Sequence, residues 1–179
     1  MPSQTHFDAI ALLKADHRKV EDLFAEFAAA KKQALVEKIC AELSGHTVIE
    51  EELFYRACRG KVEDALLNEG YVEHDGSKVL IAELIASAPN EEFYDAKVKV
   101  LSEQMEHHVH EEEKPSEGIF SQAPAAGLDM AELGDRMKAR REVILAEYQT
   151  SGIPAPETRT FTGHALEQGE PVDENEAPG

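Results

Sequence analysis

The stretch LSEQMEHHVHEEEK, residues 101–114, places imidazole and carboxylate side chains directly after an apolar helical pattern. Leu101, Met105, His108 and Glu112 follow one another at intervals of four, three and four residues. Side chains at these intervals project from one face of a helix. The stretch therefore predicts a helix whose apolar stripe continues into an inward-facing histidine and glutamate.

A second pair, His107 and Glu111, competes for the same role on this helix. Its line runs back through Gln104 and Val100, which form a weaker apolar stripe. We favour the pair that begins at His108, and the sequence leaves the choice between the two pairs open.

The same spacing occurs earlier in the chain, around the stretch HTVIEEELF at residues 46–54. Ile39, Leu43, His46 and Glu50 again follow one another at intervals of four, three and four. A second helix is therefore predicted to direct a histidine and a glutamate into the interior.

Two further helical patterns contribute one histidine each. His17 lies between Leu13 and Val20 at intervals of four and three, and His74 follows Tyr71 by three residues. Both positions belong to apolar faces. Each of four predicted helices thus directs at least one histidine inward.

The apolar periodicity predicts an all-α protein, with four long helices joined by short connections in an antiparallel, up-down-up-down four-helix bundle. Gly70 and Gly76 interrupt the third pattern, which predicts a kink or a split there. A loop, a fifth helix and a flexible, disordered acidic tail are expected to follow, so that the folded domain spans 1–150. The helices are predicted over residues 3–30, 32–59, 61–87, 91–113 and 129–150, the loop over 114–127 and the tail over 151–179.

The net charge and the cysteine spacing indicate which partners and which cellular location to expect. Acidic residues number 36 against 18 basic ones, a net charge of -18, which disfavours nucleic acid and anionic membrane surfaces as partners. Cys40 and Cys58 show no metal-binding or disulfide spacing, and the start of the sequence lacks a signal-peptide pattern. We therefore expect a cytoplasmic protein.

Six side chains are candidate metal ligands. Two carboxylates buried in one core would repel each other and lose their hydration, unless cations compensate them. Imidazole and carboxylate without thiolate suit Fe, Mn or Zn, and six donors suit two ions better than one tetrahedral zinc. The His-x-x-x-Glu order differs from the Glu-x-x-His order of ferritin-like proteins. The candidates are His17, His46, Glu50, His74, His108 and Glu112.

Over residues 7–123 the chain resembles the hemerythrin-like proteins of the HHE cation-binding family, in the pattern H, HxxxE, H, HxxxE on four helices. The resemblance implies a non-heme centre of two Fe ions, cycling between Fe2+ and Fe3+, with an oxo or hydroxo bridge. The four histidines would be terminal ligands, and Glu50 and Glu112 would bridge the metals. The implied function is binding or reduction of a small oxidant: O2, H2O2 or NO.

The sequence departs from the oxygen-carrying members of that family. They have a HxxxH pair on the third helix, whereas here Lys78 stands four residues after His74; their last helix has HxxxxD, and here it has HxxxE. One histidine fewer indicates a more open site and argues against reversible oxygen carriage. Tyr71 and Tyr55 are candidates to fill the gap, although aromatic residues in a stripe usually pack in the core.

Other roles stay open. Asp16, Glu73 and Asp75 are candidate partners of the ligand imidazoles.

The alternative function is a non-catalytic iron or oxygen sensor, or an iron-storage module, whose acidic tail or fifth helix engages a partner. The sequence leaves open which small oxidant binds, whether it is turned over, and whether the chain forms a homodimer. The fifth helix carries basic residues opposite its apolar stripe: Arg136, Lys138, Arg140 and Arg141.

Overall fold

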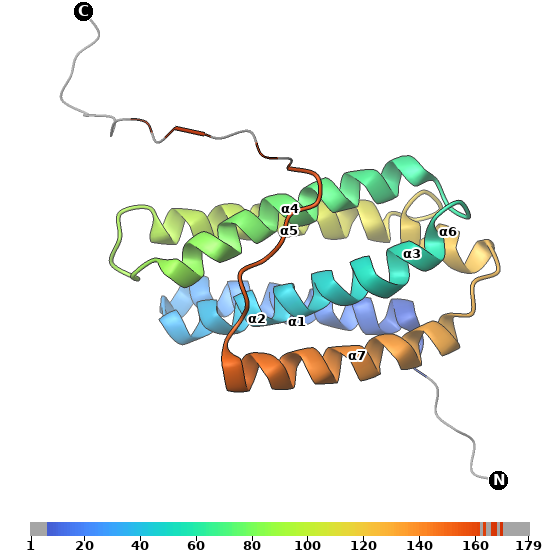
Figure 1. The fold of residues 1–179 in the computed structure, drawn as a ribbon, viewed down its shortest axis with the longest axis horizontal. Helices are drawn as coiled ribbons and strands as arrows, with labels where there is room; N and C mark the ends of the chain where they lie inside the picture. Colours follow the sequence, from blue (N-terminus) through green and yellow to red (C-terminus); the bar gives the residue numbers. More distant parts are fainter. Residues whose placement is uncertain (1–6, 162, 164–165, 168, 170–179) are drawn as a thin grey trace, which may run out of the picture.

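Four helical rods lie side by side in the computed structural model, which describes residues 7–161, 163, 166–167 and 169 (Figure 1). The second rod is continuous although it changes type, because a π-helical turn joins two α-helices. The rods are α1 (Ala9–Ala30), α2–η1–α3 (Gln33–Ile49, Glu50–Phe54 and Tyr55–Cys58), α4 (Asp64–Ala86) and α5 (Tyr94–Glu113).

The rods pack as a closed ring: α1 contacts α2 and α5, α2 contacts α4, and α4 contacts α5. Short connections, such as the two residues between α1 and α2, make consecutive rods antiparallel. No strand occurs in the described part of the chain. The predicted all-α, four-helix bundle is confirmed.

Helix α1 begins later than the sequence pattern suggested. Asp8 is its N-cap, and the Asp8 carboxylate accepts a hydrogen bond of 2.9 Å from the backbone N–H of Ala11. An aspartate in this position satisfies a backbone donor that the first helical turn leaves unpaired. Residues 3–6, which were predicted to be helical, lie outside the described residues.

The apolar core is divided into two parts along the bundle. One contains Phe24, Ile39 and Leu101, and the other contains Leu13 and Phe54. On α1, α2 and α4 the predicted inward histidine lies between residues of these two parts, and on α5 His108 lies among residues of the first part. The histidines therefore form a polar layer in the middle of an apolar bundle.

The structure differs from the sequence prediction in two places, a predicted loop and a predicted break in a helix. The region predicted as a loop contains a short helix, α6 (Ile119–Ala125), and α4 runs unbroken through both glycines that were expected to kink or split it. Helix α4 packs against both α2 and α5 along the bundle.

The predicted fifth helix is α7 (Met130–Ser151), which lies along the outside of the bundle against α1 and α2 (Figure 1). Asp129 caps it by accepting hydrogen bonds from the backbone N–H groups of Ala131 and Glu132, at 3.0 and 2.9 Å. Its buried apolar side chains are Met130, Leu133, Met137 and Ile144.

Part of the predicted tail contacts the bundle. The backbone N–H groups of Arg159 and Thr160 donate hydrogen bonds of 2.7 and 2.6 Å to Asp75, which is fully buried. Most residues after 161 lie outside the described residues, so the domain boundary after residue 150 stays a prediction. In the described part of the chain, no helix is both long and apolar enough to cross a lipid bilayer.

Candidate metal centre

Four buried imidazoles meet in the polar layer, one from each rod. His17 on α1 and His46 on α2 place their Nε2 atoms 3.2 Å apart. His74 on α4 and His108 on α5 place theirs 3.3 Å apart. Each histidine is at most 4% exposed. The imidazoles thus form two pairs, each able to offer two nitrogens to one ion.

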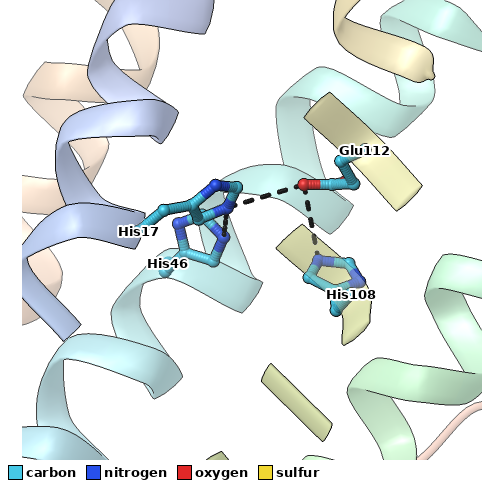
Figure 2. Close-up of side chains that lie close together, drawn as sticks. All are labelled: His17, His46, His108 and Glu112. Atoms are coloured by element: carbon cyan, nitrogen blue, oxygen red, sulfur yellow. Dashed lines mark hydrogen bonds and ion pairs between the residues drawn. The ribbon is translucent and has the colours of Figure 1, made fainter. Parts of the chain in front are cut away.

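Two carboxylates connect these pairs. Glu50 Oε2 lies 3.1 Å from His46 Nε2 and 3.2 Å from His74 Nε2, one histidine of each pair. Glu112 Oε2 lies 3.5 Å from His17 Nε2 and 3.4 Å from His108 Nε2, again one of each pair (Figure 2). Each carboxylate therefore spans both candidate metal positions.

These carboxylate oxygens lack hydrogen bonds. Both oxygens of Glu50 are without a hydrogen-bond partner among the described residues, and so is Oε2 of Glu112. Glu50 is fully buried and Glu112 is 3% exposed. Buried acceptors left without donors are costly, which is the situation that a bound cation would relieve.

The π-helical turn η1 explains why two consecutive glutamates are both buried. The backbone N–H of Tyr55 bonds to the carbonyl of Glu50, five residues back, so the turn is wider than in an α-helix. Glu50 points into the centre, and Glu51, 5% exposed, points to the outer side of His74. Single π-helical turns within α-helices occur frequently at functional sites.

The outer ring nitrogens of two histidines contact carboxylates at hydrogen-bonding distance. His17 Nδ1 lies 2.9 Å from Glu113 Oε1, and His108 Nδ1 lies 2.6 Å from Glu73 Oε2. A carboxylate that accepts the Nδ1 proton leaves Nε2 free to bind a metal, and it orients the ring.

The other two histidines have the same kind of neighbour. His74 Nδ1 lies 3.2 Å from Glu51 Oε1, and His46 Nδ1 lies 3.7 Å from Asp16 Oδ2. All four inner nitrogens therefore face the centre, and all four outer nitrogens face an acidic group.

Of the candidate partners named from the sequence, Asp16 and Glu73 lie beside histidines and Asp75 does not. Asp75 instead binds Lys78 at 3.0 Å and the chain at Arg159 and Thr160. Its distance from the rings reflects the α4 helix, because the residue after His74 points about 100° away around the helix.

Sequence reasoning missed Glu51 and Glu113, which each follow a predicted ligand. Their contacts reach residues 23 and 96 positions away. The available signal was the run of three glutamates in each HxxxE stretch, which exceeds what a single ligand needs. Each run supplies one inward carboxylate and one that supports a histidine.

Lys78 occupies the place four residues after His74 and is buried, at 8% exposure. Its ammonium donates hydrogen bonds of 2.6 Å to Glu51 and 3.0 Å to Asp75. These two carboxylates hold Lys78 on the outer side of the histidine layer.

Tyr55 contacts a predicted ligand directly, and Tyr71 contacts Tyr55. The hydroxyl of Tyr55 donates a hydrogen bond of 2.7 Å to Glu112 Oε1, and the ring of Tyr71 packs edge-on against Tyr55. A Cβ at Gly70 would lie 2.5 Å from the Tyr55 hydroxyl oxygen, so glycine there leaves the space that the hydroxyl occupies.

The site shifts the pKa of its members strongly. Burial and the nearby charge of Glu50 raise the pKa of Glu112 to about 7. Burial opposes a charge on His46, yet Glu50 and Asp16 raise its pKa to about 10, whereas burial and the neighbouring His46 lower that of His17 to about 2. Without a cation the cluster holds protons in place of metal ions.

The competing pair on α5 lies elsewhere. The His107 side chain is 61% exposed and lies 3.3 Å from Glu73, and Glu111 is half-exposed. The candidate metal-binding groups in the interior contain His108 and Glu112. All six predicted ligands therefore gather in one place; that they bind metal stays a prediction.

Comparisons with known proteins bear on the family and the fold. The sequence model of the hemerythrin HHE cation binding domain matches residues 8–115. A crystal structure of a hemerythrin HHE cation binding domain-containing protein from Mycobacterium kansasii is similar in fold, with a TM-score of 0.65 and 22% identity. The similarity covers 82% of this chain and 94% of that one. A search of curated proteins found no match.

Proposed function

Since the chain belongs to the hemerythrin HHE cation-binding family, we propose that it holds two iron ions and binds or reduces a small oxidant, O2, H2O2 or NO. The observation that carries the proposal is the position of Glu50 and Glu112. Each carboxylate contacts at least one histidine of each pair and has a buried oxygen without a hydrogen-bond donor.

The donor set fits two ions of this kind. Each position would receive two imidazole nitrogens and a share of two carboxylates, and the fully nitrogen- and oxygen-based set suits iron. The two negative charges would be compensated by the metal charge instead of by protons. We infer an oxo or hydroxo bridge from the family resemblance.

Bound iron would supply one-electron chemistry between Fe2+ and Fe3+, together with a coordination position open to a small exogenous ligand. The protein's own contribution is orientation and exclusion of water. The carboxylates at hydrogen-bonding distance from the outer nitrogens hold the imidazoles of His17, His74 and His108 in one tautomer, and the apolar core on both sides keeps the layer dry.

Lys78 supports binding or reduction over reversible carriage. Oxygen-carrying relatives have a further histidine at the corresponding place, whereas Glu51 and Asp75 here bind the lysine ammonium on the outer side. The centre would have one protein nitrogen fewer, and an exogenous ligand could take that position.

The burial of the centre supports a small ligand. Every one of the six side chains is at most 4% exposed, which suits a diatomic molecule or peroxide better than a bulky substrate. Two buried free thiols, Cys40 and Cys58, support the proposed cytoplasmic location, where thiols stay reduced.

Metal analysis and spectroscopy on one sample test this function. Protein produced with iron should contain about two Fe per chain and show a charge-transfer band in the near ultraviolet. A single zinc ion without such a band would refute the proposal. Anaerobic reduction followed by separate exposure to O2, NO and H2O2 identifies the ligand, and consumption of the oxidant distinguishes an enzyme from a sensor or storage module.

A further inference from the structure

An arginine from the C-terminal part of the chain lies behind His74. Arg159 Nε donates a hydrogen bond of 2.9 Å to Glu51 Oε2, and the other oxygen of that carboxylate lies 3.2 Å from His74 Nδ1. The guanidinium is thus separated from a predicted ligand by a single carboxylate.

A second arginine lies in the corresponding place behind His46. Arg141 on α7 forms an ion pair with Asp16 through two contacts. Arg141 Nε lies 2.9 Å from Asp16 Oδ2, and Arg141 Nη2 lies 2.9 Å from Asp16 Oδ1. Asp16 Oδ2 faces His46 Nδ1 at 3.7 Å. Both arginines therefore act on carboxylates that face the outer nitrogens of predicted ligands.

These two arginines reach both imidazole pairs, because His46 belongs to one pair and His74 to the other. A third arginine, Arg18 on α1, donates a hydrogen bond of 3.1 Å to Glu113, the carboxylate beside His17. Arg141 and Arg159 both lie beyond residues 8–115, the part of the chain that matches the family. The C-terminal part thus reaches both halves of the centre.

A carboxylate beside the outer nitrogen makes an imidazole a stronger electron donor, which favours the more highly charged metal state. An arginine bonded to that carboxylate draws off part of its negative charge and weakens this effect. We propose that Arg159 and Arg141 are positioning residues: they raise the reduction potential of the centre, and they fix the carboxylates that orient His74 and His46, which helps to retain ferrous iron. This inference rests on the proposed di-iron function.

Arg159→Gln is the principal test, because the Arg159 side chain is 55% exposed and its replacement leaves the core intact. The midpoint potential of the iron-loaded protein, measured by spectroelectrochemistry, should fall, because Glu51, which stays paired with Lys78, regains the part of its negative charge that Arg159 compensates and so stabilises Fe3+. Arg159→Lys keeps the positive charge and should restore a potential close to that of the unmodified protein.

Arg140→Gln is the matched control. Arg140 also lies in the C-terminal part and also forms a two-contact ion pair, to Glu52 at 2.8 and 3.1 Å, but Glu52 contacts no histidine in the described structure. The control removes the same charge and should shift the potential much less than Arg159→Gln does.

Iron loss to a chelator gives a second readout. Residues that support metal ligands typically contribute about 10–100-fold to metal affinity, so Arg159→Gln should release iron from the reduced, ferrous protein roughly tenfold faster than Arg140→Gln does, because Glu51 no longer holds the His74 ring in place. Arg141→Gln should change both readouts in the same direction, with thermal unfolding measured alongside because Arg141 also binds Glu42.

Equal shifts in Arg159→Gln and Arg140→Gln would overturn the inference, and so would a lysine variant that shifts as far as the glutamine variant. In either case an unmodified protein with two irons would leave the proposed function standing. Unmodified protein without a redox-active iron pair would overturn both.

Discussion

The hydroxyl of Tyr55 donates a 2.7 Å hydrogen bond to Glu112, although the two residues are 57 positions apart in the sequence and both are buried. The bond joins the rod that carries Glu50 to the one that carries Glu112. It satisfies the outer oxygen of Glu112 and leaves the inner oxygen to face the histidines.

Tyr55→Phe should destabilise the metal-free protein by about 1–3 kcal/mol, because it leaves a buried carboxylate oxygen without its donor. Urea unfolding of the metal-free protein measures this. Tyr71→Phe is the control, since no hydrogen bond involves the Tyr71 hydroxyl among the described residues. Equal effects of the two substitutions would show that the bond contributes nothing specific.

Gly70→Ala should displace Tyr55, because the added Cβ would lie 2.5 Å from its hydroxyl oxygen. We expect a loss of about 1–3 kcal/mol in stability from overpacking, and a smaller loss when the same substitution is made in Tyr55→Phe protein. Gly76→Ala on the same helix meets only Gln104, at 3.8 Å, and should stabilise by about 0.4–1 kcal/mol. Additive effects of positions 70 and 55 would contradict this coupling.

Glu50→Gln should reduce the iron content from about two per chain to one or fewer, because a neutral amide bridges cations poorly. Metal analysis of protein produced with iron measures this content. Glu52→Gln provides the control two residues away, where the carboxylate pairs with Arg140 instead of facing the centre. Full iron content in Glu50→Gln would rule out a bridging role.

Metal binding at pH 7 should release protons, and affinity should rise with pH. In the metal-free protein the pKa of His46 is raised to about 10, so its imidazole is charged at pH 7; that of Glu112 is raised to about 7, so its carboxyl is half-protonated. Both groups must lose their protons to bind an ion. Calorimetric titrations in two buffers of different ionisation enthalpy count the protons, and heats that are independent of the buffer would disprove the release.

Some features of the centre were readable from single helices. The repeated interval of four, three and four puts His46 and Glu50, and likewise His108 and Glu112, on the inner face of their rods. The choice of His108 over His107 followed from the better apolar stripe, and the structure places His108 in the interior and leaves His107 exposed. Such predictions succeed because helical periodicity is a local property.

The carboxylates around the histidines were only partly predictable. Asp16 and Glu73 were recognised as candidates, but Asp75 binds Lys78 and the C-terminal segment instead. Glu51 was missed because its burial depends on contacts with His74 and Lys78 of α4, which the spacing within its own helix does not reveal.

By itself, the sequence determined the number of rods, the inner face of each and the residue types that face inward, because these depend on spacing within about two helical turns. Only the tertiary structure decided which histidines pair, which carboxylate supports each one, and that arginines beyond the family domain reach two of those carboxylates. These contacts join residues up to 125 positions apart. The packing of the rods against one another determines which residues meet, and the sequence of a single helix does not reveal that packing.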